Sequence, residues 1–104
     1  MITLSIRYRI DHNKLRHFET YARSLAEPIR RCGGDLIGYY LPTRFAGRTD
    51  EALALIDFPD LASYERYRAA LADDPEGQAA LAQVESAGCI VREDRGFLQR
   101  VSSI

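Results

Sequence analysis

The chain has 104 residues, the length of one ordinary domain, and its composition of 46% hydrophobic and 28% charged residues excludes a disordered chain. Fourteen basic residues oppose fifteen acidic ones, so the net charge of −1 provides no general attraction for nucleic acid or for an anionic membrane. We therefore predict a single domain over residues 1–104 that binds neither.

Residues 2–10 alternate apolar and polar side chains, a period of two that is typical of a strand with one buried face. In residues 15–31 the apolar side chains recur at intervals of three and four, which predicts an amphipathic helix. This helix is expected to end at Gly33-Gly34, because glycine adopts the left-handed C-cap conformation at little cost.

Two almost continuously apolar segments, residues 36–41 and 52–58, are predicted as the second and third strands. The next helix is expected to open at Pro59-Asp60, with Asp57 as its capping residue. The inward side of that helix is predicted to carry Leu61, Tyr64, Tyr67, Arg68 and Leu71.

Residues 73–76 have the sequence DDPE, which predicts the start of a further short helix. The segment combines an aspartate cap, a proline at the first helical position and an acid near the positive end of the helix dipole. This helix is expected to end at Gly88. The final strand is predicted in two pieces, residues 89–91 and 97–101, because the polar residues 92–96 interrupt the apolar pattern.

The predicted elements follow the order β-α-β-β-α-(α)-β. This order is typical of the ferredoxin-like plan, an α+β fold with a four-stranded antiparallel sheet and its helices on one face. The second and third strands carry apolar residues on both faces, and such strands are normally covered on both sides. Because the helices cover one side only, we predict a homodimer whose two sheets meet face to face. The alternatives are cover from elsewhere in the chain or a face left in water.

Three segments have recognisable motifs: GDLIGYY at residues 34–40, TDEALAL at 49–55, and the stretch from Tyr64 to the DPE of 74–76. Together they resemble the NIPSNAP family, which shows a glycine-led strand, an Asn-Glu turn into an apolar strand, and an arginine-rich helix followed by Asp-Pro. Asp50-Glu51 stands where the family has Asn-Glu, and Arg68 matches a helix arginine. The opening LSIRY at residues 4–8 resembles the family's start, so the resemblance covers nearly the whole chain.

The resemblance implies the dimeric α+β barrel of this superfamily, the same face-to-face dimer that the strand pattern predicts. Some family members carry histidine and tryptophan on the third strand, where this chain has Ala54 and Ile56, and a glutamate where it has Ser5. The resemblance therefore implies a more apolar interior here. It implies no agreed catalytic activity, and whether the chain is an enzyme stays open.

The sequence contains no motif for metal binding, redox chemistry or nucleotide binding. Cys32 and Cys89 lie far apart without CxxC spacing, and we interpret them as small apolar side chains. His12 and His17 do not share one helix face, and no GxGxxG or GxxxxGK stretch is present. We therefore predict no metal site and no cofactor.

The expected location is the cytoplasm. No apolar run approaches the ~20 residues of a membrane-spanning helix. The first ten residues contain Arg7 and Arg9 where a signal peptide needs an apolar stretch.

The candidate ligand-binding residues are Arg7, Tyr39 and Tyr40. If the polar face of the first strand looks into the barrel, Arg7 meets one of the two tyrosines above an apolar cavity, and a few polar groups in an apolar pocket are typical of a small-ligand site. The guanidinium would orient a carboxylate or phenolate. The alternative is that Arg7 pairs with an acid across the dimer interface. Base stacking on Tyr39 and Tyr40 is set aside because no basic run flanks this strand, which is expected to be central.

These observations predict a bacterial-type, NIPSNAP-like homodimer that binds a small, largely apolar ligand between or beneath its sheets. The second hypothesis is a cofactor-independent monooxygenase acting on an aromatic substrate, since relatives in the same superfamily have that activity. A third is a scaffold dimer with a filled interior. The size of the barrel cavity and the residues that line it distinguish the three.

Overall fold

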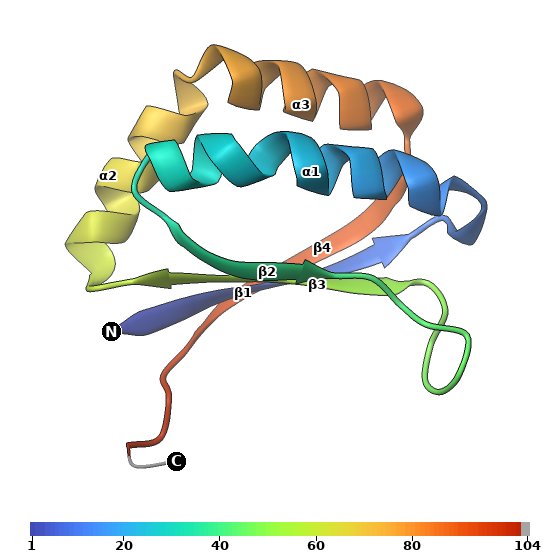
Figure 1. Ribbon diagram of the computed structural model, residues 1–104, viewed down its shortest axis with the longest axis horizontal. Coiled ribbons are helices and arrows are strands. Elements are labelled where there is room, and N and C mark those ends of the chain that lie inside the picture. Colours follow the sequence, from blue (N-terminus) through green and yellow to red (C-terminus); the bar gives the residue numbers. More distant parts are fainter. Residues whose placement is uncertain (103–104) are drawn as a thin grey trace.

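All helices of the described chain lie on one face of a four-stranded antiparallel sheet (Figure 1). The structure is a computed structural model that describes residues 1–102. Its strands are β1 (Ile2–Ile10), β2 (Asp35–Tyr40), β3 (Glu51–Phe58) and β4 (Ile90–Leu98). Its helices are α1 (Leu15–Arg31), α2 (Leu61–Ala72) and α3 (Pro75–Ala87), with a 3-10 turn at His12–Lys14. None of the helices in this part of the chain is both long enough and apolar enough to cross a membrane.

The strands are arranged in the order β2-β3-β1-β4. This order and the antiparallel pairing confirm the predicted ferredoxin-like α+β fold. The prediction that Tyr39 and Tyr40 occupy a central strand is wrong. β3 lies between β1 and β2 and pairs with both, which leaves β2 at one edge of the sheet and β4 at the other.

Helix α1 forms where the apolar periodicity predicts it. Its buried stripe includes Phe18, Leu25 and Ile29, each no more than 6% exposed. Gly33 follows the helix with φ of 110°, a left-handed conformation that favours glycine, and its N–H donates to the carbonyl of Arg30 at 3.2 Å.

Aspartate side chains cap α2 and α3. Asp60 accepts a hydrogen bond from the N–H of Ser63 at 2.8 Å, and Asp74 accepts one from the N–H of Gly77 at 2.9 Å. Both carboxylates satisfy donors that a helix leaves free in its first turn. Helix α3 ends before Gly88, whose φ of 64° is left-handed, so the predicted start and end of this helix are confirmed.

The Asp74 carboxylate also ties the start of α3 to the end of α1. The Nη2 atom of Arg31 donates to both of its oxygens at 2.8 Å. This contact, together with the N–H of Gly77, holds the pKa of Asp74 below its usual value.

Two predictions about α2 are wrong. Asp57 does not cap this helix, because its side chain lies on the sheet and accepts a hydrogen bond from the hydroxyl of Thr3 on the paired strand. Leu61 is 59% exposed, since it lies in the first turn, ahead of the part of α2 that packs against the sheet. Tyr64 and Tyr67 are buried as predicted.

The final strand is continuous, which corrects the prediction of two pieces. Residues 92–96 pair with β1 from Arg9 to Ser5, although their side chains are polar or absent. The pairing depends on backbone groups along the free edge of β1, and an edge strand tolerates polar side chains on either face. Val101 lies beyond the end of β4.

The two faces of the sheet differ in character. The helix-facing side of β1 and β3 is a buried apolar layer that includes Leu4, Ile6 and Ile56. The opposite side, which we call the open face, carries half-buried leucines on β3, exposed apolar side chains on β2, and polar side chains along β1. Its apolar residues include Ile37, Tyr40, Leu53 and Leu55.

Gly34 provides a test of the packing between α1, α2 and the sheet. A Cβ atom at this position would lie 2.9 Å from Ile29, 3.0 Å from Ile56 and 3.1 Å from Tyr67, all closer than normal contact. Gly34→Ala should therefore lower the free energy of unfolding by about 1–3 kcal/mol, measured by urea denaturation. Asp35→Ala, at the next and exposed position, is the matched control and should have the smaller effect. Equal effects of the two substitutions would contradict this account.

Candidate functional site

A cavity of about 420 Å³ lies between the sheet and the helices. Its floor is the helix-facing side of β1 with part of β3, and residues of α1, α2, α3 and β4 complete its wall. The inner lining includes the buried aliphatic side chains of Leu4, Ile6, Leu25, Ile29 and Ile56. Exposed lining residues mark where the cavity opens to solvent, and they include Arg68, Gln78, Leu81, Glu93 and Arg95.

The cavity lining is rich in tyrosine. Those in the lining are Tyr8, Tyr21, Tyr39, Tyr64 and Tyr67. They belong to two sets of packed aromatic rings. In the first, Tyr8 lies edge-on to Phe18 with 4.8 Å between ring centroids. In the second, Tyr64 and Tyr67 lie against Phe58 at 5.4 Å and 4.8 Å. Edge-on and tilted packing of this kind fixes the ring orientations.

Four of the lining tyrosines have hydroxyls that remain protonated at neutral pH. Burial raises the pKa of Tyr8, Tyr39 and Tyr67 above the usual value, and neighbouring phenols add to the effect. Burial also raises the pKa of Tyr21 to about 12, with a further contribution from the charge of Glu93. These four groups are therefore neutral hydrogen-bond donors and acceptors rather than phenolate bases.

The charged groups in the cavity wall come mainly from β4. Glu93 and Arg95 are two residues apart on one strand, so both side chains face the helix side of the sheet. The Nε atom of Arg95 donates to Glu93 at 2.7 Å. Burial works against the charge of Arg95, but the hydrogen bond and the charge of Glu93 outweigh it and raise the pKa of Arg95.

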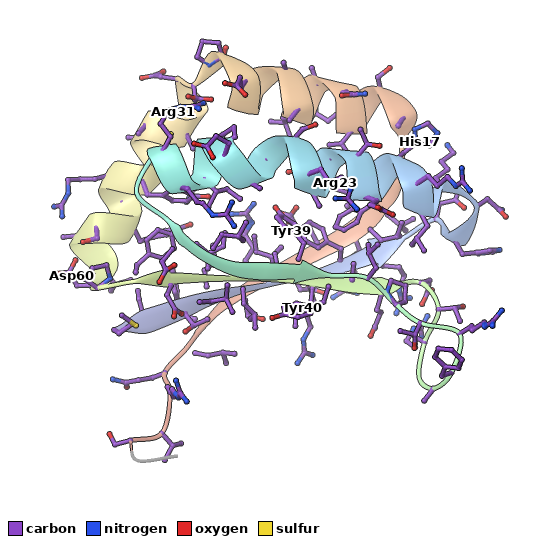
Figure 2. The ribbon with its side chains drawn as sticks, viewed as in Figure 1. His17, Arg23, Arg31, Tyr39, Tyr40 and Asp60 are labelled. Atoms are coloured by element: carbon purple, nitrogen blue, oxygen red, sulfur yellow. The ribbon has the colours of Figure 1, made fainter. Side chains whose placement is uncertain are left out.

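The three residues predicted from the sequence lie on different faces. Tyr39 faces the helices and lines the cavity, whereas Tyr40 lies on the opposite side of the sheet (Figure 2). Arg7 pairs with Leu53, which in turn pairs with Tyr40, so these three residues form one cross-strand row on the open face. The structure therefore places Arg7 with Tyr40 and away from Tyr39.

Arg7 borders a second, smaller hollow of about 230 Å³ at the open face. Charged side chains dominate its lining: Arg7, Arg9, Glu51, Arg92 and Asp94. Arg7 lies directly opposite Asp94 in the pairing of β1 with β4. The hollow beside Arg7 is therefore lined by ionic groups, unlike the aromatic cavity on the other side of the sheet.

Sequence reasoning missed Glu93 and Arg95 because residues 92–96 were interpreted as a break between strands. The signal was present in the alternation of the segment. Glu93, Arg95 and Phe97 share one parity, and Phe97 packs edge-on against Tyr64 at 4.9 Å. A continuous strand would have directed all three toward the helices.

The histidines and cysteines lie outside the cavity lining. His12 and His17 are exposed, Cys32 is partly buried, and Cys89 is buried at the start of β4; neither thiol is in a disulfide. Figure 2 shows His17 near the amino-terminal end of α1. Within residues 1–102, no three His, Cys, Asp or Glu side chains are grouped so as to hold a metal ion.

Comparison with known families identifies the chain. The family model named NIPSNAP matches residues 4–103, nearly the entire sequence. The chain belongs to the NIPSNAP family. The resemblance noted in the strand and helix motifs is thereby confirmed. Among curated proteins, no match was found.

Solved structures share the fold. A NIPSNAP family protein with unknown function from Agrobacterium tumefaciens has a TM-score of 0.86 at 18% identity, with 100% of this chain and 91% of that chain covered. An uncharacterised NIPSNAP-like domain protein from Burkholderia xenovorans has a TM-score of 0.78 at 26% identity, covering 99% and 87%. SnoaB, a cofactor-independent oxygenase from Streptomyces nogalater, has a TM-score of 0.69 at 12% identity, covering 99% and 95%.

The buried phenols predict a delayed alkaline titration. In the unfolded chain tyrosine ionises near pH ~10, whereas Tyr8, Tyr21, Tyr39 and Tyr67 have raised pKa values in the folded protein. Their neutral form therefore contributes stability below pH ~10, and this contribution is lost as the pH rises through the folded-state values. The native protein should develop less phenolate absorbance at pH ~10 than the protein in urea. Coincident titration curves in the two states would contradict the burial of these groups.

Proposed function

We propose that this NIPSNAP-family protein is a cytoplasmic homodimer that binds a small, largely apolar ligand in the cavity between its sheet and its helices. The observation that carries the proposal is the tyrosine-lined cavity itself. The free thiols of Cys32 and Cys89 support the location, because disulfides are uncommon in the reducing cytoplasm.

The size and lining of the cavity suit a small organic molecule. Its volume of about 420 Å³ lies within the usual range for ligand pockets, and a cavity of ~150 Å³ already holds benzene. Two or three fused rings therefore fit. Aliphatic side chains such as Ile6 and Leu25 provide apolar contact, while the neutral tyrosine hydroxyls offer a few fixed hydrogen bonds.

The open face supports the dimer. Ile37 and Tyr40 are 49% and 47% exposed, and Leu98 at the end of β4 is 57% exposed, while Leu53 and Leu55 are only half-buried in one chain. If ~400 Å² of apolar surface is buried, at ~25 cal/mol per Å², each subunit is stabilised by about 10 kcal/mol before the costs of association. A second copy of the chain would bury these apolar side chains, because its own open face has the same shape and composition.

A cofactor-independent oxygenase is the second candidate. The specific observation in its favour is the shared fold with SnoaB, together with an aromatic cavity that suits a flat substrate. Tyr8 and Tyr39 would orient such a substrate without removing a proton from it, because burial raises their pKa values. Oxygen uptake in the presence of an aromatic substrate would favour this candidate over simple binding.

The dimer can be tested by one substitution on each side of the sheet. Leu55→Glu places a carboxylate in the middle of the open face, where its cross-strand neighbours Ser5 and Gly38 are uncharged. It should weaken dimerisation at least ~100-fold, because the charge would be buried without an opposite charge directly across from it. Leu61→Glu makes the same change at an exposed position on α2 and should have no effect. Sedimentation velocity at micromolar concentration measures both. A monomeric wild type would contradict the dimer.

The ligand cavity can be tested with naphthalenemethanol, a neutral two-ring probe. Its binding should perturb amide signals of β1 and α1 in NMR spectra of the labelled protein. Leu71→Trp should fill part of the cavity and weaken binding by about tenfold or more, because Leu71 lines it. Leu61→Trp adds the same side chain outside the lining and is the control. The absence of binding to the wild type, or equal loss in both variants, would contradict the proposal.

A further inference from the structure

The guanidinium of Arg95 has unused hydrogen-bonding capacity at the wall of the cavity. Arginine carries five N–H donors, and here its Nε atom donates to Glu93 at 2.7 Å. Within residues 1–102, no hydrogen bond or ion pair of the protein uses its terminal nitrogens. A planar group with two free NH₂ donors matches the geometry of a carboxylate.

Arg95 stands at one end of a row of residues that crosses the cavity floor. Arg95 pairs with Ile6, Ile6 pairs with Ala54, and Ala54 pairs with Tyr39, so the four residues form one row across all four strands. With strands ~4.8 Å apart, the backbones of Arg95 and Tyr39 are roughly 14 Å from each other. The charged end and the phenolic end of the row are thus separated by the apolar residues of the two central strands.

The solvent exposure of Arg95 and Glu93 indicates which end of a ligand these two side chains would contact. The side chains of Arg95 and Glu93 are 49% and 32% exposed, whereas Ile6 and Ala54 are almost completely buried. A ligand with an apolar ring system and one charged group therefore gains most by placing its rings over the buried floor and its charge at β4. In addition, the Glu93 carboxylate occupies the Nε side of the Arg95 guanidinium.

We propose that Arg95 anchors the carboxylate of an aromatic acid in this cavity through its terminal nitrogens, and that Glu93, which holds the Nε atom, positions the guanidinium and offsets part of its charge. This inference rests on the proposed function and specifies the ligand class of the same site. The ligand is an arene carboxylate of about two or three fused rings, with its rings among the tyrosines and its carboxylate on the terminal nitrogens of Arg95.

The charge balance of the lining favours a monoanion. Of the lining residues that carry charge, Arg68 and Arg95 are positive and Glu93 is negative, which leaves an excess of one positive charge. A single carboxylate neutralises this excess, while a phosphate dianion would leave a negative charge over an apolar floor. Arg68, the other positive residue of the lining, lies on α2.

The experiment compares two probes that differ in one group. Naphthoate and naphthalenemethanol have the same rings, but only the first carries a carboxylate. Arg95→Gln should weaken naphthoate binding by ~10- to 100-fold and change naphthalenemethanol binding less than about twofold. Arg95→Lys, which keeps the charge but loses the planar fork, should give a smaller loss for naphthoate. It also serves as the test should the glutamine variant fail to fold.

Glu93→Gln should have the opposite effect on naphthoate binding. It removes the one acidic side chain that residues 1–102 contribute to the lining, so it should strengthen naphthoate binding several-fold and leave naphthalenemethanol binding unchanged. Arg66→Gln on α2 is the control, because Arg66 bonds Ser63 and does not line the cavity. Arg68→Gln measures the contribution of the other lining arginine, which should be smaller than that of Arg95.

The outcomes separate this inference from the proposed function. If neither probe binds the wild type, the ligand cavity itself is refuted. If naphthalenemethanol binds but Arg95→Gln leaves naphthoate unaffected, the cavity stands and the carboxylate anchor is refuted. If Glu93→Gln weakens naphthoate, or Arg68→Gln costs more than Arg95→Gln, the assigned roles of Glu93 and Arg95 are overturned.

Discussion

The pairing of β1 with both of its neighbours is the constraint on which the rest of the structure depends. This strand contacts β3 on one side and β4 on the other, and its alternation sends Leu4, Ile6 and Tyr8 toward the helices. The register between β4 and β1 then determines which β4 residues lie beside Leu4, Ile6 and Tyr8. Because Arg95 is opposite Ile6 and Glu93 is opposite Tyr8, an ion pair borders an otherwise apolar and aromatic space. No single element contains this site; it is assembled by the register.

The layer between sheet and helices combines aliphatic side chains with six buried aromatic rings, and rigid rings of this size leave space between them. The six are Tyr8, Phe18, Tyr21, Phe58, Tyr64 and Tyr67. Tyrosine brings a large side chain that packs edge-on, and its hydroxyl favours a place where a polar partner or water can reach it. The ring sets around Phe18 and Phe58 support the two ends of the layer. A core made only of leucine and isoleucine would more easily close to normal interior density.

The fold was largely predictable, since α1 and β1 have strong periodicity, β3 is a nearly continuous apolar run, and the caps at Asp74, Gly33 and Gly88 are local signals. The strand order and the continuity of β4 were harder, because edge pairing uses backbone groups that leave no mark in the sequence. The site was predictable only in part. Tyr39 lines the cavity, whereas Arg7 was favoured over Arg95 because the ligand site was expected on the polar face of β1 and residues 92–96 were interpreted as a break between strands.

The edge position of β4 makes the charges of the cavity wall sensitive to chain length. The pairing of β4 with β1 has a register irregularity between Arg9 and Ile10, so it already accommodates an extra residue at that end. One further inserted residue there, with the irregularity kept, would slide the rest of β4 by one position and turn its side chains over. Arg92 and Asp94 would then replace Glu93 and Arg95 beside the tyrosines, reversing the order of positive and negative charge along the cavity wall. A one-residue change in one short connection would thus alter the electrostatics of the cavity while leaving the central strands untouched.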